Sequence, residues 1–171
     1  MSGERLALQP GKARTEPVAA PDGSIAPRDF IVVGAVGAGK SALFNALLGQ
    51  SGAVLKTACL EYHDACTVDT PGEYFDNPRY YTALIATMST IRTALYVHPA
   101  NCFDLKLPPG LFRIYPMQVV GVISKIDLAD ADEARVRALL GELGITGEVF
   151  STSIDRPDTI ARLRQFLVGA R

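Results

Sequence analysis

The sequence lacks tryptophan, has only three cysteines and carries almost no net charge. An odd number of cysteines without regular spacing argues against a disulfide framework, and the start has no basic and apolar run typical of a secretory signal. A cytoplasmic location is therefore expected. The net charge of −1 gives no electrostatic basis for general binding to nucleic acid or to an anionic membrane, so we expect neither as a partner.

Long hydrophobic runs are also absent, because no apolar stretch reaches the roughly 18 residues that a membrane-spanning helix needs. The 171 residues, with 48% hydrophobic and 20% charged side chains, are typical of one globular domain. Residues 1–29 contain repeated prolines and no sustained periodicity. We expect a flexible tail over residues 1–29 and a single domain over residues 30–171.

Short apolar runs alternate with helical patterns from Phe30 onward. The runs predict strands at residues 30–33, 65–69, 94–98, 119–124 and 148–151. The helical patterns lie at residues 43–48, 78–88, 136–143 and 160–167. This order predicts an α/β fold of three layers, with a mostly parallel central sheet and helices on both faces. Prolines in residues 99–116 predict a loop there, with at most a short helix.

Residues 34–41 match the phosphate-loop pattern G-x-x-x-x-G-K-[ST], between a predicted strand and a predicted helix. The glycines allow backbone N–H groups to surround phosphate oxygens at a helix N-terminus. The Lys40 ammonium is expected to reach the β- and γ-phosphates, and the Ser41 hydroxyl to bind Mg²⁺. The predicted nucleotide-contacting residues here are Gly34, Val36, Gly37, Ala38, Gly39, Lys40, Ser41 and Ala42.

A second motif, Asp-Thr-Pro-Gly, occupies residues 69–72. We expect Asp69 to hold the Mg²⁺ shell and the Gly72 N–H to contact the γ-phosphate. The alternative is a plain turn, since Asp, Pro and Gly all favour turns.

A third motif, Ser-Lys-Ile-Asp, occupies residues 124–127 at the end of a predicted strand. The Asp127 carboxylate can accept hydrogen bonds from N1–H and the 2-amino group of guanine, and adenine offers no such pair. The Lys125 stem is expected to cover the base plane while its ammonium stays in water. These residues predict GTP or GDP as the ligand. The alternative is that Asp127 caps a helix over residues 129–143.

These three motifs in this order resemble the TRAFAC-type small GTPases, over residues 30–167. The resemblance implies a Ras-like P-loop NTPase fold that binds GTP or GDP with Mg²⁺. It also implies that the loop containing Ser151, Thr152 and Ser153 contacts the guanine O6.

Further stretches look like the EutP/PduV family: residues 34–41, Lys56 with Thr57, residues 69–74, residues 79–81 and residues 108–110. The resemblance implies a link to a bacterial microcompartment for ethanolamine or propanediol utilisation, with a shell protein or a second copy of the chain as partners. It also implies that Thr57 completes the Mg²⁺ shell and senses the γ-phosphate. The alternative is an exposed loop threonine.

Two residues depart from the usual GTPase pattern. Ser124 stands where Asn or Thr is usual, so we expect weaker guanine affinity, with specificity resting mainly on Asp127. Glu73 stands where some GTPases have a glutamine that orients the attacking water. Glu73 is a candidate catalytic residue together with Lys40 and Thr57, and the alternative is an ion pair with Arg79.

Three functions remain open. The first is a GTP-binding protein that hydrolyses GTP slowly, because no arginine is placed to act as an internal finger, and whose nucleotide state controls a microcompartment interaction. The second is an ATP-dependent kinase of a small acid such as acetate, with Arg79 or Arg113 as the nearest candidates for binding the acid. The third is a non-enzymatic, nucleotide-stabilised scaffold.

Overall fold

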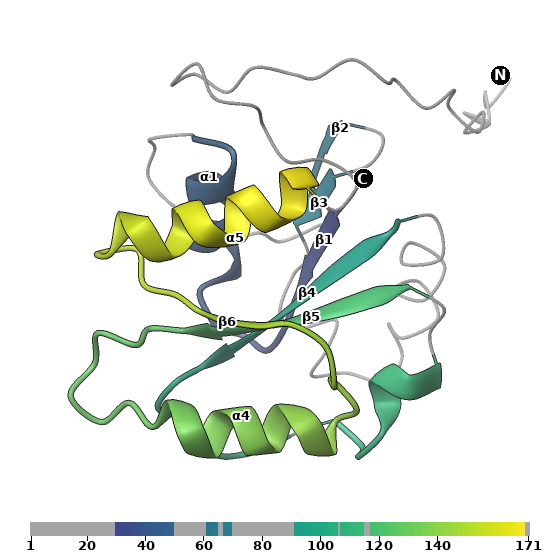
Figure 1. Cartoon of the computed structure of the whole chain (residues 1–171), viewed down its shortest axis with the longest axis vertical. Helices are drawn as coiled ribbons and strands as arrows, with labels where there is room; N and C mark the ends of the chain where they lie inside the picture. The colour runs from purple at the N-terminus through teal and green to yellow at the C-terminus, as the bar shows by residue number, and fades with distance from the viewer. Residues whose placement is uncertain are drawn as a thin grey trace, which may run out of the picture.

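Six strands form one sheet in the computed structural model, which describes residues 30–49, 61–64, 67–69, 91–105, 107–114 and 117–169 (Figure 1). The strands are β1 (Phe30–Val33), β2 (Glu61–Asp64), β3 (Thr67–Asp69), β4 (Thr93–Pro99), β5 (Gln118–Ser124) and β6 (Val149–Ser151). Their order is β2-β3-β1-β4-β5-β6. Only the β2–β3 pair is antiparallel, so the predicted mostly parallel sheet is confirmed.

Helices cover both faces of the sheet: α1 (Lys40–Leu47) and α5 (Pro157–Gly169) lie on one face, and α4 (Glu133–Glu142) lies on the other (Figure 1). Alternate residues of β1 show why, because Phe30 and Val32 pack with α1 and α5, whereas Ile31 and Val33 belong to the core under α4. All four β1 side chains are buried. Apolar residues on both faces are typical of a central strand in a parallel sheet.

The predicted strands agree with the observed ones where the structure describes them. β1 has the predicted bounds, β4 and β5 are longer than predicted, β6 is one residue shorter at its start, and β3 occupies the last part of residues 65–69. β2 was not predicted. The predicted helix at residues 78–88 and the predicted tail at residues 1–29 lie outside the described residues.

The proline-rich connection between β4 and β5 contains the short 3₁₀ helix η2 (Leu111–Ile114), in agreement with the predicted loop and short helix. It packs on the end of α4, where the backbone N–H of Gly110 donates to the Glu142 carbonyl at 2.9 Å and that of Phe112 to the Leu143 carbonyl at 3.1 Å. These bonds satisfy carbonyl groups that the last turn of α4 leaves unpaired.

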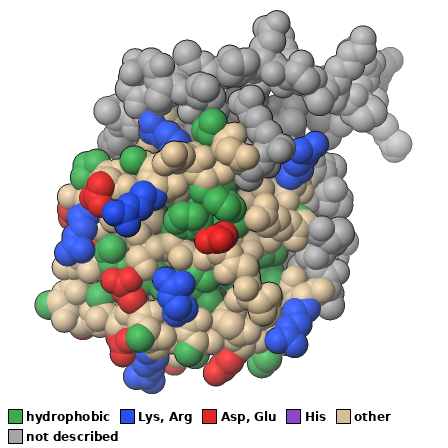
Figure 2. All heavy atoms as spheres, viewed as in Figure 1, with side chains coloured by type: hydrophobic (Ala, Val, Ile, Leu, Met, Phe, Trp, Pro, Cys, Tyr) green, Lys and Arg blue, Asp and Glu red, His purple; other side chains and the backbone are tan. Residues whose placement is uncertain are grey.

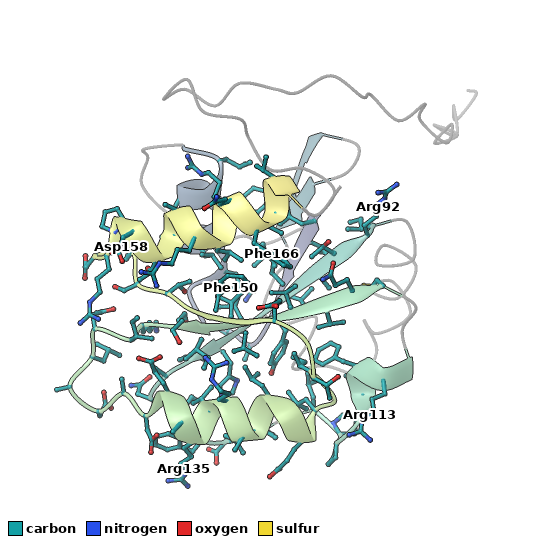
Figure 3. The ribbon with its side chains drawn as sticks, in the orientation of Figure 1. Arg92, Arg113, Arg135, Phe150, Asp158 and Phe166 are labelled. Carbon is teal, nitrogen blue, oxygen red and sulfur yellow. The ribbon has the colours of Figure 1, made fainter. Side chains whose placement is uncertain are left out.

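The sheet edge at β6 is short and partly covered. Phe150 of β6 lies against Phe166 of α5, with ring centroids 5.1 Å apart (Figure 3). The Arg137 guanidinium approaches the Val149 carbonyl, with its Nη1 at 3.4 Å. In the same orientation, Figure 2 shows apolar side chains at the surface between α5 and α4. A short edge strand with a cation beside one of its carbonyl groups is less available for pairing with another strand.

Within the described part of the chain, no helix is long and apolar enough to cross a membrane.

Packing of α5 on the sheet predicts a large effect of truncating its buried face. Leu163 is fully buried in the core that α1, α5, β1, β4 and β5 share. Leu163→Ala should lower the free energy of unfolding by about 2–5 kcal/mol, because the lost methyl groups leave a cavity. Urea unfolding followed by circular dichroism measures this change. The matched control is Arg162→Ala on the exposed side of α5, and equal effects of the two substitutions would contradict the packing described.

Candidate functional site

The phosphate loop joins β1 to α1, as its motif predicts. Gly34 has a φ of +148°, and a Cβ added there would overlap the carbonyl oxygen of Val97 on the neighbouring strand β4. Gly39, directly before α1, has a φ of +90°. Both conformations favour glycine, which tolerates positive φ and close backbone approach. The glycines at these two positions therefore let the chain turn sharply from the sheet into the helix.

Lys40 begins α1, and its side chain lies against the loop that precedes it. Its ammonium donates a hydrogen bond to the Ala35 carbonyl at 2.9 Å, and the residue is 7% exposed. The cation is thus held inside the turn of the phosphate loop. The helix N-terminus adds a partial positive charge at the same place, so this end of the sheet is suited to an anionic group.

The loop after β5 is tied to the phosphate loop by two side-chain hydrogen bonds. The Ser124 hydroxyl donates to the Ala38 carbonyl at 2.7 Å, and the Lys125 ammonium donates to the Gly37 carbonyl at 2.8 Å. Serine, although shorter than asparagine, therefore reaches the phosphate loop. This bond of the Lys125 ammonium lies at an exposed position, and Lys125 itself has a φ of +60°.

Asp127 is exposed at the next turn, and its environment favours the ionised form. The pKa of its carboxyl is lowered, chiefly by a hydrogen bond from the Ser153 side chain and by one from a backbone N–H. The positive charges of Arg156 and Lys125 lower the same pKa further. Asp127 does not cap the following helix. α4 begins at Glu133, and the Asp132 carboxylate accepts the capping hydrogen bond from the Arg135 N–H at 3.0 Å.

The loop after β6 is anchored to β5 and to α5. The Thr152 N–H donates to the Ile123 carbonyl at 2.7 Å, and the Ser153 N–H donates to the Thr159 hydroxyl at 3.1 Å. The Ser153 hydroxyl accepts from the Asp155 N–H at 3.1 Å. Thr152 and Ser153 are both buried. Ser153, whose side chain bonds Asp127, is therefore held in place by contacts within the fold.

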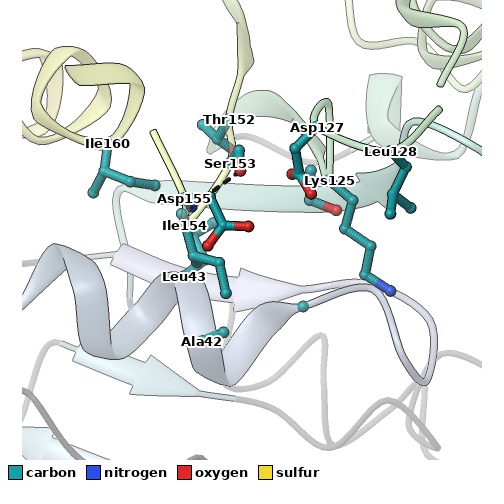
Figure 4. A pocket seen from close by; sticks show the side chains of 12 residues that line it. Ala42, Leu43, Lys125, Asp127, Leu128, Thr152, Ser153, Ile154, Asp155 and Ile160 are labelled. Atoms are coloured by element: carbon teal, nitrogen blue, oxygen red, sulfur yellow. Dashed lines mark hydrogen bonds between the residues drawn. The ribbon is translucent and has the colours of Figure 1, made fainter. Parts of the chain in front are cut away.

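These loops line an open cavity of about 340 Å³ next to the phosphate loop (Figure 4). Seven of the lining residues are predicted site residues: Gly39, Ala42, Ser124, Lys125, Asp127, Thr152 and Ser153. The other five were not predicted: Leu43, Leu128, Ile154, Asp155 and Ile160. Asp155 lies only two residues after Ser153, and Leu128 directly follows Asp127. Their closeness in sequence to predicted site residues was the available signal for both.

Other predicted site residues lie outside the cavity lining or outside the described residues. Val36 is 52% exposed on the phosphate loop and Ser151 ends β6, and neither lines the cavity. Asp69 ends β3, where its backbone pairs with Val32 of β1. It therefore lies at the end of the sheet from which the phosphate loop emerges. The predicted residues Thr57, Gly72 and Glu73 lie outside the described residues.

Comparison with solved structures defines the class of fold. The chain matches a bacterial selenocysteine-specific elongation factor, EF-Sec, with a TM-score of 0.59 and 18% identity over 85% of this chain and 29% of that one. It matches Methanosarcina barkeri Roco2 RocCORdC bound to GDP with a TM-score of 0.55 and 19% identity over 84% of this chain and 49% of that one. The chain thus spans less than half of each of these proteins. Its fold is that of a P-loop GTPase domain.

Comparison of sequences identifies the family. Residues 28–168 match the model of the PduV-EutP family, described as ethanolamine utilisation and propanediol utilisation, and the chain belongs to this family. It is 44% identical over 138 residues to "Probable acetate kinase EutP" of Salmonella typhimurium, covering 80% of this chain and 87% of that protein. It is 26% identical over 127 residues to "Propanediol utilization protein PduV" of Citrobacter freundii, covering 74% of this chain and 84% of that protein.

The contact between Ser153 and Asp127 predicts how the site titrates. Ser153→Ala should raise the pKa of the Asp127 carboxyl toward its ordinary value, because the chief hydrogen bond to the ionised form is lost. Because the pKa is lowered by folding, the ionised group adds stability at pH values above its pKa in the unfolded chain. This contribution is lost as the pH falls through the pKa in the folded state. The window of lost stability should therefore move to higher pH in the variant.

Carbon-detected NMR of the Asp127 carboxyl during an acid titration measures this pKa. Ser151→Ala is the matched control, since Ser151 does not line the cavity. An Asp127 pKa that stays the same in Ser153→Ala would show that the hydroxyl does not hold the carboxylate.

Proposed function

We propose that this chain binds a guanine nucleotide with Mg²⁺ and hydrolyses GTP slowly. The observation that carries the proposal is the cavity beside the phosphate loop, which the exposed Asp127 carboxylate lines and where it accepts a hydrogen bond from the Ser153 side chain. An ionised carboxylate only accepts hydrogen bonds, so it suits the adjacent N1–H and 2-amino donors of guanine. The GDP named with the Roco2 structure supports a nucleotide at this edge of the sheet.

The base and the phosphates would occupy neighbouring parts of one site. The cavity would hold the base between the loops after β5 and β6, with the phosphates on the loop before α1. The Lys40 ammonium would exchange the Ala35 carbonyl for phosphate oxygens, where it stabilises charge during attack by water on the γ-phosphate. Because Ser124 and Lys125 connect the two loops, the position of the base would fix the position of the phosphates.

The residues of this sheet edge fit Mg²⁺. The ion prefers oxygen ligands and retains several waters while it bridges phosphates. The hydroxyl of Ser41 in the first turn of α1 and the carboxylate of Asp69 at the end of β3 are donors of that kind. Thr57 is the proposed third protein ligand. Mg²⁺ would neutralise charge on the phosphates during phosphoryl transfer.

We propose that the nucleotide state controls an interaction with a microcompartment for ethanolamine or propanediol utilisation. The family description, ethanolamine utilisation and propanediol utilisation, supports this role. The partner would be a shell protein or a second copy of the chain.

A second candidate function is phosphoryl transfer from ATP to acetate, which the name of the 44% identical Salmonella typhimurium relative favours. The phosphate loop and Mg²⁺ would act in the same way, and a carboxylate oxygen would replace water as the nucleophile. Of the two arginines that are candidates for binding the acid, Arg79 lies outside the described residues and Arg113 does not reach the site. It packs against Gly144 after the end of α4, and Figure 3 shows it at the opposite end of the sheet from Asp158 of α5.

The role of Asp127 predicts a change in base preference. Asp127→Asn should weaken GDP binding about ten- to a hundredfold, because a charge-assisted acceptor is lost. The same variant should bind xanthosine diphosphate more tightly than the native chain does, because the asparagine amide can donate to the C2 carbonyl of xanthine. Isothermal titration calorimetry with Mg²⁺ measures both affinities. A misfolded variant would lose both ligands, and unchanged discrimination would contradict the guanine assignment.

The two candidate reactions predict different products. Incubation of the chain with Mg²⁺ and GTP, and in parallel with ATP, should release inorganic phosphate slowly from GTP, with or without acetate, and Lys40→Ala should reduce the rate by about 10²-fold or more. Phosphorus NMR distinguishes inorganic phosphate from acetyl phosphate. Acetyl phosphate that forms only when acetate is present, and is lost in Lys40→Ala, would support the second function instead. The urea-unfolding midpoint of the variant controls for loss of fold.

A further inference from the structure

The cavity contains a second acidic side chain that the proposed function does not use. Asp155 lines the cavity from the loop after β6, and Figure 4 shows its carboxylate directed into the space above Ala42 and Leu43. Its backbone N–H is fixed by the Ser153 hydroxyl at 3.1 Å. Within the part of the chain that the structure describes, the Asp155 carboxylate has no hydrogen-bond or ionic partner, so its acceptor oxygens are available to a ligand.

Asp127 and Asp155 line the cavity from two loops, so a ligand that bonds both carboxylates needs hydrogen-bond donors on two sides. Asp127 and Asp155 come from different loops, and the Ser153 hydroxyl contacts both residues. The donors of guanine at N1 and N2 lie on one edge, and its other free polar atoms, N3, O6 and N7, are acceptors. Adenine has its donor at the 6-amino group, where guanine has the carbonyl. A guanine held by Asp127 therefore offers no base donor to Asp155.

We propose that Asp155 is a specificity-determining residue that admits adenine nucleotides to this site by accepting a hydrogen bond from the 6-amino group. The proposal rests on the proposed nucleotide site and extends its substrate class to both purines. Asp127 favours guanine, whereas Asp155 favours adenine and repels the guanine carbonyl. Ser124 does not oppose either base, because its hydroxyl is donated to the Ala38 carbonyl at 2.7 Å. The selectivity between guanine and adenine then depends on the balance between the contact with Asp127 and the contact with Asp155.

The position of Asp155 favours a contact with the base over one with the sugar. Ser153 connects Asp155 to the loop that contains the base-reading Asp127. The sugar, in contrast, must lie toward the phosphate loop, where the Lys125 ammonium bonds the Gly37 carbonyl at 2.8 Å. The apolar side chains of Leu43 and Ile160 line the same cavity and suit a flat purine ring.

The test compares Asp155→Asn with Asp158→Asn by calorimetric titration of the full chain with Mg²⁺ and GDP, ADP or 2′-deoxy-ADP. Asp158 is the matched control, because it is exposed in the first turn of α5, outside the cavity lining, and its substitution removes the same charge. Relative to the control, Asp155→Asn should weaken ADP binding about tenfold and leave GDP binding unchanged or tighter, since the new amide can donate to O6. In the native chain, 2′-deoxy-ADP should bind as well as ADP.

Other outcomes would overturn the proposal. An unchanged ratio of ADP to GDP affinity in Asp155→Asn would show that the carboxylate does not discriminate between the bases, and the proposed nucleotide site would still stand. A loss of 2′-deoxy-ADP affinity in the native chain as large as the loss of ADP affinity in Asp155→Asn would assign Asp155 to the sugar. If neither GDP nor ADP binds to the native chain, the proposed function itself fails, together with this extension of it.

Discussion

Parallel pairing of β1, β4 and β5 is the constraint on which the candidate site depends. Val33 at the end of β1 pairs with Tyr96 of β4, and Ser124 at the end of β5 pairs with Pro99 of the same strand. The loops that follow β1 and β5 therefore emerge at one edge of the sheet, close enough for the Ser124 hydroxyl to bond the phosphate loop. Ligand sites of open α/β sheets form at this edge for the same reason.

Local sequence signals were sufficient to predict elements that consist of an apolar run or a helical pattern ending at a glycine. They were insufficient where contacts between distant parts of the chain determine the structure. β1 was predicted with its observed bounds because its apolar run stops at Gly34. The structure shows that this glycine is needed where the chain approaches strand β4 closely. β2 (Glu61–Asp64) is polar and pairs only through its neighbour β3, so no local pattern marked it. Helix capping could not be assigned locally either, because Asp127 and Asp132 are equally good caps by residue type, and the fold uses Asp132.

The candidate reactions share their nucleotide chemistry and differ in the nucleophile. In both proposed reactions, Lys40 and the helix N-terminus would face the phosphates, and the cavity near Asp127 would hold the base. A P-loop GTPase fold therefore specifies how a nucleotide is held, without specifying whether water or a carboxylate attacks it. The names of the relatives and the fold of the structural neighbours do not conflict, because one fold can support different reactions.

The connection from β4 to β5 is hydrogen-bonded to both ends of helix α4. At one end the Asp132 N–H donates to the Ala100 carbonyl at 2.9 Å, and at the other the Gly110 and Phe112 N–H groups bond carbonyls of the last turn. A segment without a long helix of its own thus shares its hydrogen bonds with the helix beside it. Local unfolding of this segment would remove the C-terminal cap of α4, so their backbone amides should exchange with solvent as one cooperative unit, slowly despite the many prolines.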